Sequence, residues 1–148
     1  MRTIDALYRS GVAVAPDCTL QAAATAMASA GVGSLAVLDG DRLVGIVTDR
    51  DLVRRGLARG LSPDARVDAT MSSPVVTIRA DADLHEAFEL FRTNAVRRVA
   101  VMRGDRFAGM LTLDDLLVRV SIDLADLVRP VTAEILFAHR DHQVPAVT

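Results

Sequence analysis

Two Thr-x-x-Asp sets are the residues of this chain best suited to do chemistry. Thr48 precedes Asp51, and Thr112 precedes Asp115, by the same spacing and at the expected start of a helix. A carboxylate accepts hydrogen bonds from two neighbouring hydroxyl groups, and a Thr at a helix N-terminus lies beside backbone N–H groups that favour anions. The same spacing is that of a capping box, in which the two side chains only cap their own helix. Spacing alone does not separate binding from capping.

A pair of arginines distinguishes the second half of the chain from the first. Arg97 and Arg98 precede an expected strand, at positions where the first half has Gly33 and Ser34. A guanidinium group binds an anion such as phosphate with two parallel hydrogen bonds. Paired Arg at a loop-to-strand junction is also typical of solvated surface charge. Successive side chains of a strand point to opposite faces, so we expect one of the two, Arg98, to face a site.

An internal repeat positions these residues. Residues 20–55 align without gaps on residues 84–119, a shift of 64 positions, and the segment 4–6 matches 67–69. Self-similarity on this scale indicates two copies of one supersecondary unit. We therefore expect the two Thr-x-x-Asp sets to occupy equivalent places in two similar units.

Each copy is predicted to form a β-α-β-β-α unit. A short apolar run precedes a helical stretch, and two further strands are joined by a turn that contains Gly. The strands are expected at 12–14, 35–38, 43–47, 75–78, 99–102 and 107–111, and the helices at 20–30, 48–57, 84–91 and 112–120. Residues 131–137 are compatible with either a strand or a helix.

The organisation that follows has two motifs, a joint and a tail. We expect a first motif at 1–59, a linker at 60–65 with the sequence Gly-Leu-Ser-Pro-Asp at its start, a second motif at 66–129 and a C-terminal tail at 130–148. The fold class is α+β. Neither motif is expected to stand alone, because each is too short to enclose a core of its own.

The ordered motifs of the repeat resemble the signature of the CBS domain. In the second copy they are Asp68–Ile78, Asp81–Leu84, Val96–Val101 and Gly109–Leu116, and the first copy follows with Asp17–Leu20, Leu35–Leu38 and Gly45–Leu52. The resemblance implies two CBS motifs related by a pseudo-two-fold axis, an arrangement called a Bateman module. Such modules commonly pair into disc-shaped dimers.

The resemblance also implies a ligand. In CBS pairs the clefts between the motifs bind adenosine-containing molecules, and the Thr and Asp of Gly-x-x-Thr-x-x-Asp hold phosphate and ribose. Within the doubled pattern we favour this role over simple capping. The residues to which it carries over are Thr48, Asp51, Thr112 and Asp115, with Arg98 and then Arg97 for the phosphates, and Val12, Val14, Val76 and Ile78 in the zone of the adenine ring.

The two sites are not expected to be equal. Because Arg97 and Arg98 belong to the second copy, the sequence favours the Thr112–Asp115 site as the main nucleotide site. The Thr48–Asp51 site is then either empty or occupied by a nucleoside without a strong grip on phosphate. Arg50 and Arg54 are interpreted as surface charges.

Composition excludes several other functions. A net charge of −2 and an aromatic content of 3% argue against nucleic-acid binding. No apolar run approaches the roughly 18–20 residues of a membrane span, and the N-terminal residues lack a secretory pattern, which favours a cytoplasmic location. The single Cys18 cannot form an internal disulfide, and His139 with His142 is too small a set to indicate a metal, so no metal is assigned.

The sequence therefore predicts a regulatory module and no enzyme, since it shows no nucleophile or acid–base constellation. The expected ligand is AMP, ADP or ATP, and the expected signal is a change in dimer packing read by an unknown protein effector. A hydrophobic fraction of 51% also favours a homodimer. The alternative is a ligand-independent dimerising scaffold with degenerate nucleotide sites.

Overall fold

The computed structural model describes residues 3–140, with side chains up to residue 130. The chain divides into two compact units: the first ends at Leu113 and holds the repeat except for the closing helix of its second copy, and the second begins at Asp114.

The first motif consists of a three-stranded sheet and two helical segments. Its elements are β1 (Ala13–Val14), α1 (Leu20–Ala30), β2 (Ser34–Asp39), β3 (Arg42–Thr48) and α2 (Asp49–Asp51), which continues as the π-helical turn η2 (Leu52–Gly56) and the 3₁₀ turn η3 (Leu57–Arg59). Strand β1 pairs in parallel with β2, and β2 pairs antiparallel with β3. The closing helix is thus present where it was expected, but it is irregular.

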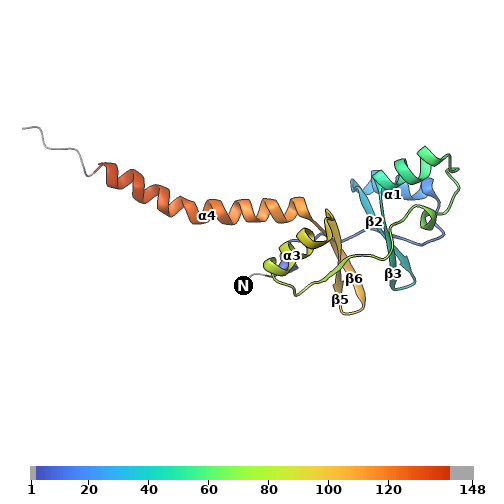
Figure 1. Ribbon diagram of the computed structural model, residues 1–148, viewed down its shortest axis with the longest axis horizontal. Coiled ribbons are helices and arrows are strands. Elements are labelled where there is room, and N and C mark those ends of the chain that lie inside the picture. Colours follow the sequence, from blue (N-terminus) through green and yellow to red (C-terminus); the bar gives the residue numbers. More distant parts are fainter. Residues whose placement is uncertain (1–2, 141–148) are drawn as a thin grey trace, which may run out of the picture. The chain divides into compact units, whose positions relative to one another are not determined.

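The second motif repeats this order with β4 (Thr77–Arg79), α3 (Leu84–Asn94), β5 (Arg98–Arg103) and β6 (Arg106–Thr112). The two hairpins carry register shifts at equivalent places, and each turns through a glycine with positive φ, Gly40 at 63° and Gly104 at 66°. Only glycine adopts this conformation without strain. The two sheets confirm the α+β class, and β3 contacts β6 where the hairpins stand next to each other (Figure 1).

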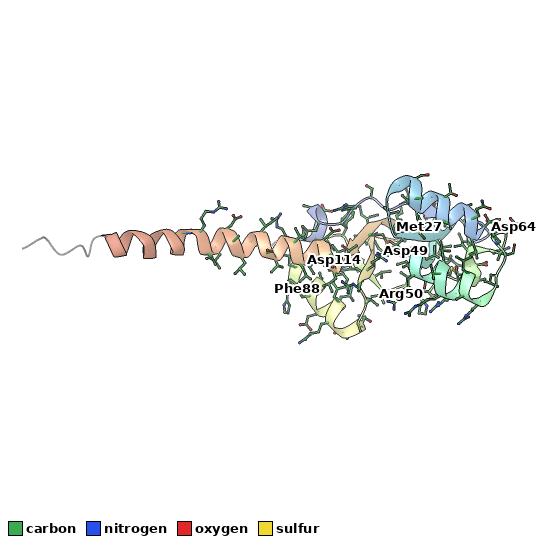
Figure 2. All side chains as sticks on the ribbon, turned by 90° about the horizontal axis from the view of Figure 1, so that it is seen from above. Met27, Asp49, Arg50, Asp64, Phe88 and Asp114 are labelled. Atoms are coloured by element: carbon green, nitrogen blue, oxygen red, sulfur yellow. The ribbon has the colours of Figure 1, made fainter. Side chains whose placement is uncertain are left out.

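The helices of the two motifs begin and end for local reasons. Thr19 caps α1 by accepting a hydrogen bond from the Ala22 N–H at 3.1 Å, and Asp83 caps α3 by accepting one from the Glu86 N–H at 2.8 Å. Helix α1 ends at Gly31 in the left-handed conformation. Its buried residue Met27, labelled in Figure 2, joins a core that includes Leu35 and Val47.

The two motifs exchange the segments that precede them. The 3₁₀ turn η1 (Ile4–Ala6) comes before the first motif, yet the Ile4 N–H donates to the carbonyl of Ala82 in the second motif at 2.9 Å. The matching turn η4 (Val67–Ala69) precedes the second motif, and its Val67 N–H donates to the carbonyl of Cys18 in the first at 2.7 Å. Both Ile4 and Val67 are fully buried. Each motif therefore completes its core with a segment from the start of the other.

The last helix is much longer than the sequence indicated. Helix α4 runs from Leu113 to Arg140 and passes through Pro130, so the closing helix expected to end near Val120 and the segment 131–137 form one element (Figure 1). The boundary predicted between residues 129 and 130 falls inside this helix. No described helix is both long enough and apolar enough to cross a membrane.

Candidate functional site: a cavity shared by the two motifs

Thr48 and Asp51 form a closed capping box at the end of β3. The Thr48 hydroxyl oxygen accepts a hydrogen bond from the Asp51 N–H at 3.1 Å, and Asp51 Oδ2 accepts one from the Thr48 N–H at 3.0 Å. The capping alternative is therefore correct for this pair. Capping uses only part of their capacity, because the Thr48 hydroxyl can still donate its proton and the second carboxylate oxygen can still accept.

The second oxygen of Asp51 lies in a positive environment. Arg55 Nε is 3.9 Å from Asp51 Oδ1, and Arg55 Nη1 donates to the carbonyl of Met71 at 3.4 Å. The Asp51 side chain is 16% exposed, whereas that of Arg55 is 45% exposed. Arg55 therefore links the start of this helix to the chain segment that crosses from the second motif.

That crossing segment passes directly over Gly45. Ile46 and Ser72 exchange backbone hydrogen bonds at 3.1 and 2.8 Å. A Cβ atom at Gly45 would lie 2.9 Å from Met71 Cγ and 3.1 Å from the Ser72 carbonyl oxygen, so the first residue of Gly-x-x-Thr must be small. The glycine thus brings the second motif against the Thr48–Asp51 helix start.

A cavity of about 290 Å³ opens at this junction. The first motif contributes Thr48, Asp51 and Arg50, and Figure 2 labels Arg50 next to Asp49 at the start of the helix. The rest of the lining is apolar or comes from the second motif: Ile46, Ser72, Pro74, Val75, Val76, Val96, Arg97 and Arg98. The volume is close to the lower end of small-molecule sites, which span about 300–1,000 Å³.

The cavity gives the arginines neighbours that the sequence did not indicate. The sequence placed Arg97 and Arg98 with Thr112 and Asp115, and Arg98 does lie directly opposite Thr112 in the β5–β6 pair. Both arginines also line the cavity together with Thr48 and Asp51 of the other motif. Arg50, interpreted as a surface charge, is exposed but lines the same cavity.

Gly33 makes room for the Arg98 side chain. A Cβ atom at Gly33 would lie 3.0 Å from Arg98 Nη2 and 3.2 Å from Asp49 Oδ2. The guanidinium group of Arg98 therefore reaches across to the first motif, beside the carboxylate of Asp49. This glycine occupies the position that Arg97 has in the second copy, so the difference between the copies allows the contact.

The cavity as a whole favours an anion. Three guanidinium groups, those of Arg50, Arg97 and Arg98, face one lining carboxylate, that of Asp51. A cleft lined by an excess of one charge concentrates ligands of the opposite charge. The apolar part of the lining, by contrast, suits a flat apolar group.

The four residues expected near the adenine ring do not all line the cavity. Val76 lines the cavity, and its carbonyl accepts from the Ala100 N–H at 3.1 Å, as the Val12 carbonyl does from the Ala36 N–H at 3.0 Å. Val12 and Val14 pack against the core of the first motif. Ile78 is buried and lines a separate open groove of about 860 Å³ that shares Pro74 and Val75 with the cavity.

Thr112 and Asp115 fall in different units of the chain. Thr112 ends β6 in the first unit, whereas Asp115 lies in the first turn of α4 in the second unit. The crossing that Gly45 accommodates is repeated at Gly109, where Arg9 and Met110 exchange backbone hydrogen bonds at 3.0 and 2.9 Å. Sequence reasoning missed Arg9, although the match of 4–6 with 67–69 points to it as the counterpart of Ser72.

Among the residues whose side chains are described, 3–130, no group of three or more His, Cys, Asp or Glu is placed to hold a metal ion. The side chains of His139 and His142 lie outside the described part of the chain.

Comparison with known proteins identifies the architecture. The family model of the CBS domain matches residues 6–58 and 65–122. The chain belongs to the CBS domain family, and it contains two CBS domains.

Individual CBS relatives differ in how much of the chain they share. Uncharacterized protein YlbB of Bacillus subtilis is 38% identical over 96 residues, which span 64% of this chain and 65% of YlbB. The crystal structure of Hypoxic Response Protein I with two coordinated zinc ions is 34% identical, has a TM-score of 0.69, and aligns over 78% of this chain and 97% of its own. CBSX2 in complex with AMP is 21% identical, with a TM-score of 0.70 over 84% of this chain and 98% of CBSX2, and shares the fold.

Proposed function

We propose that this CBS protein is a regulatory module that binds an adenosine-containing ligand, AMP, ADP or ATP, in the cavity beside Thr48 and Asp51. The observation that supports the proposal is the meeting, in one cavity, of the capped helix start of the first motif with Arg97 and Arg98 of the second. Membership of the CBS family and the AMP bound to CBSX2 favour the adenosine class.

Each part of the ligand has a partner of suitable chemistry. Asp51 Oδ1 accepts hydrogen bonds from the ribose hydroxyls while Oδ2 keeps the helix cap. The Thr48 hydroxyl and the guanidinium groups of Arg97 and Arg98 hold the phosphate, where charge-assisted hydrogen bonds are strong. The apolar lining, which includes Val75 and Val76, encloses the adenine ring.

A ligand in this cavity contacts both motifs, and this is how it would signal. A molecule held by Asp51 on one side and Arg98 on the other favours the relative arrangement of the motifs in which both contacts are made. We propose that this change alters the packing of a homodimer and is read by a protein effector that is still unknown. The adenosine site at Thr112 and Asp115, which the sequence favoured as the main site, and a cytoplasmic location remain predictions from the sequence.

The competing function is a dimerising scaffold with degenerate nucleotide sites. One observation favours it: Thr48 and Asp51 already satisfy each other in the capping box without any ligand. On this view the Thr-x-x-Asp sets serve the fold alone, and nucleotides leave the stability of the protein unchanged.

Ligand-dependent thermal unfolding separates the two functions. A ligand at 100 times its dissociation constant stabilises the folded state by about 2.7 kcal/mol, which corresponds to a rise in melting temperature of roughly 5–10 °C for a chain of this size. The panel is AMP, ADP, ATP, NAD, S-adenosylmethionine and adenosine. If none of the six compounds shifts the melting temperature, the sensor function is contradicted and the scaffold function is favoured.

Matched arginine variants test how the ligand is held. Arg98→Ala removes a charge-assisted hydrogen bond worth about 1.5–3 kcal/mol, so the affinity for AMP, measured by calorimetry, should fall by roughly 10- to 100-fold while that for adenosine changes little. Arg54→Ala is the control and should bind normally, because Arg54 is an exposed residue of η2 that does not line the cavity. Equal losses for AMP and adenosine would refute the assignment of Arg98 to the phosphate.

The comparison of Asp51→Ala with Asp115→Ala identifies the occupied site. Because Asp51→Ala also removes a helix cap, it should lower the melting temperature without ligand. The diagnostic quantity is therefore the further shift that AMP produces in each variant. We expect this shift to disappear in Asp51→Ala and to persist in Asp115→Ala, and the reverse would return the main site to the second motif.

A further inference from the structure

Asp49 carries a carboxylate to which the proposed nucleotide site gives no role. It follows Thr48 at the start of α2, it is exposed, and it is not among the residues that line the cavity. The Asp49 N–H donates to the carbonyl of Gly33 at 3.0 Å, and Asp49 Oδ1 accepts from the Arg50 N–H at 2.8 Å. These two bonds hold the carboxylate in one place, and neither of them uses Oδ2.

The second carboxylate oxygen of Asp49 lies beside Arg98. Asp49 Oδ2 and Arg98 Nη2 are 3.2 and 3.0 Å from one point, the place where a Cβ atom at Gly33 would stand. The opposite charges are therefore only a few ångströms apart, close enough to attract each other. Arg98 also lines the cavity. Its guanidinium group is thus within reach of two anionic partners, the carboxylate of Asp49 and a phosphate bound in the cavity.

The fold does not require an acid at this position. In the second copy Leu113 is the counterpart of Asp49, and Arg97 is the counterpart of Gly33. The Leu113 N–H donates to the carbonyl of Arg97 at 2.8 Å, so both copies make the same backbone hydrogen bond. A leucine keeps this bond without any charge. The carboxylate of Asp49 is therefore an additional feature of the copy that Arg98 reaches.

We propose that Asp49 competes with the phosphate of the ligand for Arg98 and so lowers the affinity of the cavity for phosphorylated adenosines. The inference rests on the proposed function, because it requires that Arg98 holds a phosphate. Without ligand the guanidinium group is attracted to Asp49, and a phosphate must replace this attraction with its own hydrogen bonds. Asp49 acts through Arg98 and is a positioning residue. The lower affinity keeps the cavity from being saturated, so that its occupancy still changes with the concentration of the ligand.

Asp49→Asn tests the competition with little change of shape. The variant loses the charge but keeps an amide oxygen that can accept from the Arg50 N–H. The attraction between exposed opposite charges is small, so the affinity for AMP in calorimetry should rise by roughly two- to fivefold. The affinity for adenosine should not change, and the gain for AMP should shrink at high salt, which screens exposed charges. Asp64→Asn makes the same change of net charge in the linker and is the control; Figure 2 labels both residues.

The same measurement in an Arg98→Ala background shows whether Asp49 acts through Arg98. We expect Asp49→Asn to give no gain in AMP affinity when Arg98 is absent. An equal gain with and without Arg98 would mean that Asp49 acts on the ligand directly, and it would overturn the inference. Equal AMP affinities of the unaltered protein and Asp49→Asn would overturn it as well, while leaving the proposed function intact. If neither of these two proteins binds AMP, ADP or ATP, the proposed function is refuted and the inference falls with it.

Discussion

At the scale of single residues, the position of Arg98 depends on the absence of a side chain at Gly33. The guanidinium group occupies the space beside Gly33 where a Cβ atom would lie, next to the carboxylate of Asp49. A residue that never touches the ligand therefore helps to decide where the charge of the cavity sits.

We predict that Gly33→Ala weakens AMP binding and leaves the fold intact. The added Cβ would be 3.0 Å from Arg98 Nη2, so this flexible side chain must shift by a few tenths of an ångström. The expected loss of affinity is roughly twofold to tenfold in calorimetry, which is less than that of Arg98→Ala. A combined Gly33→Ala and Arg98→Ala variant should bind no more weakly than Arg98→Ala alone, and additive losses would contradict the mechanism.

Cys18 is predicted to react slowly as a thiol. Partial burial, and to a smaller extent the neighbouring charge of Asp17, raise the pKa of the Cys18 thiol above its ordinary value. The upward shift leaves less thiolate at any given pH, and the thiolate is the reactive form. Alkylation by iodoacetamide at pH 8 should therefore be slower in the folded protein than in denaturant, and equal rates would show that the site is open.

The residue types of the site could be predicted from the sequence, but their grouping could not. Thr48 and Asp51 are recognisable by their spacing, and Arg98 by its contrast with Ser34. That Arg98 lines a cavity with Thr48 of the other motif depends on how the motifs cross, which local pattern does not encode. Asp51 illustrates the same limit, because its cap and its proposed ligand role require the same residue.

At the scale of elements, the two glycines of Gly-x-x-Thr accommodate the crossings between motifs. A Cβ at Gly109 would overlap the Arg9 carbonyl oxygen and lie 3.0 Å from the Arg9 carbonyl carbon, both of which are backbone atoms. At Gly45 the closest neighbour would be the flexible side chain of Met71. Equivalent positions of the repeat therefore differ in what they tolerate.

We predict that Gly109→Ala is more destabilising than Gly45→Ala. Overpacking against fixed backbone should cost about 2–3 kcal/mol, whereas Met71 can move aside at a cost of roughly 1 kcal/mol. Urea unfolding of the two variants measures the difference in the free energy of unfolding. Gly104→Ala is not a suitable control, because its positive φ adds a penalty of a different kind. Equal costs at the two glycines would mean that the Tyr8–Arg9 segment yields as easily as Met71.

The elements themselves were largely predictable, and the exceptions have physical reasons. The hairpin strands extend only a residue or so beyond the expected ranges because their alternation and turn glycines are local signals. The end of α4 was misplaced, because the closing helix was expected to end near Val120, whereas it continues through Pro130 to Arg140.

At the scale of the whole molecule, the exchanged segments make the two motifs depend on each other. The turn at Ile4 completes the second motif and the turn at Val67 completes the first. Deleting either half of the chain therefore removes one motif and also part of the core of the other.

We predict that the chain cut between Ser62 and Pro63 folds only when both pieces are present. Each piece alone should lack a cooperative thermal transition in circular dichroism, because Ile4 or Val67 is left without its buried site. Mixing the two pieces should restore the transition. A cooperative transition in the isolated piece 1–62 would show that the exchange is dispensable.

The exchange also bears on how such a chain could have arisen. A shorter ancestral polypeptide with one leading turn and one motif could bury its turn only in the motif of a second identical polypeptide, which makes a symmetric pair obligatory. Duplication and fusion of its gene would then place both partners in one chain, joined by the linker around Gly60, and each turn would keep its buried place. The equivalent crossings at Gly45 and Gly109 are what such a history would leave behind, and the two copies would be free to diverge afterwards, as Arg98 and Ser34 have done.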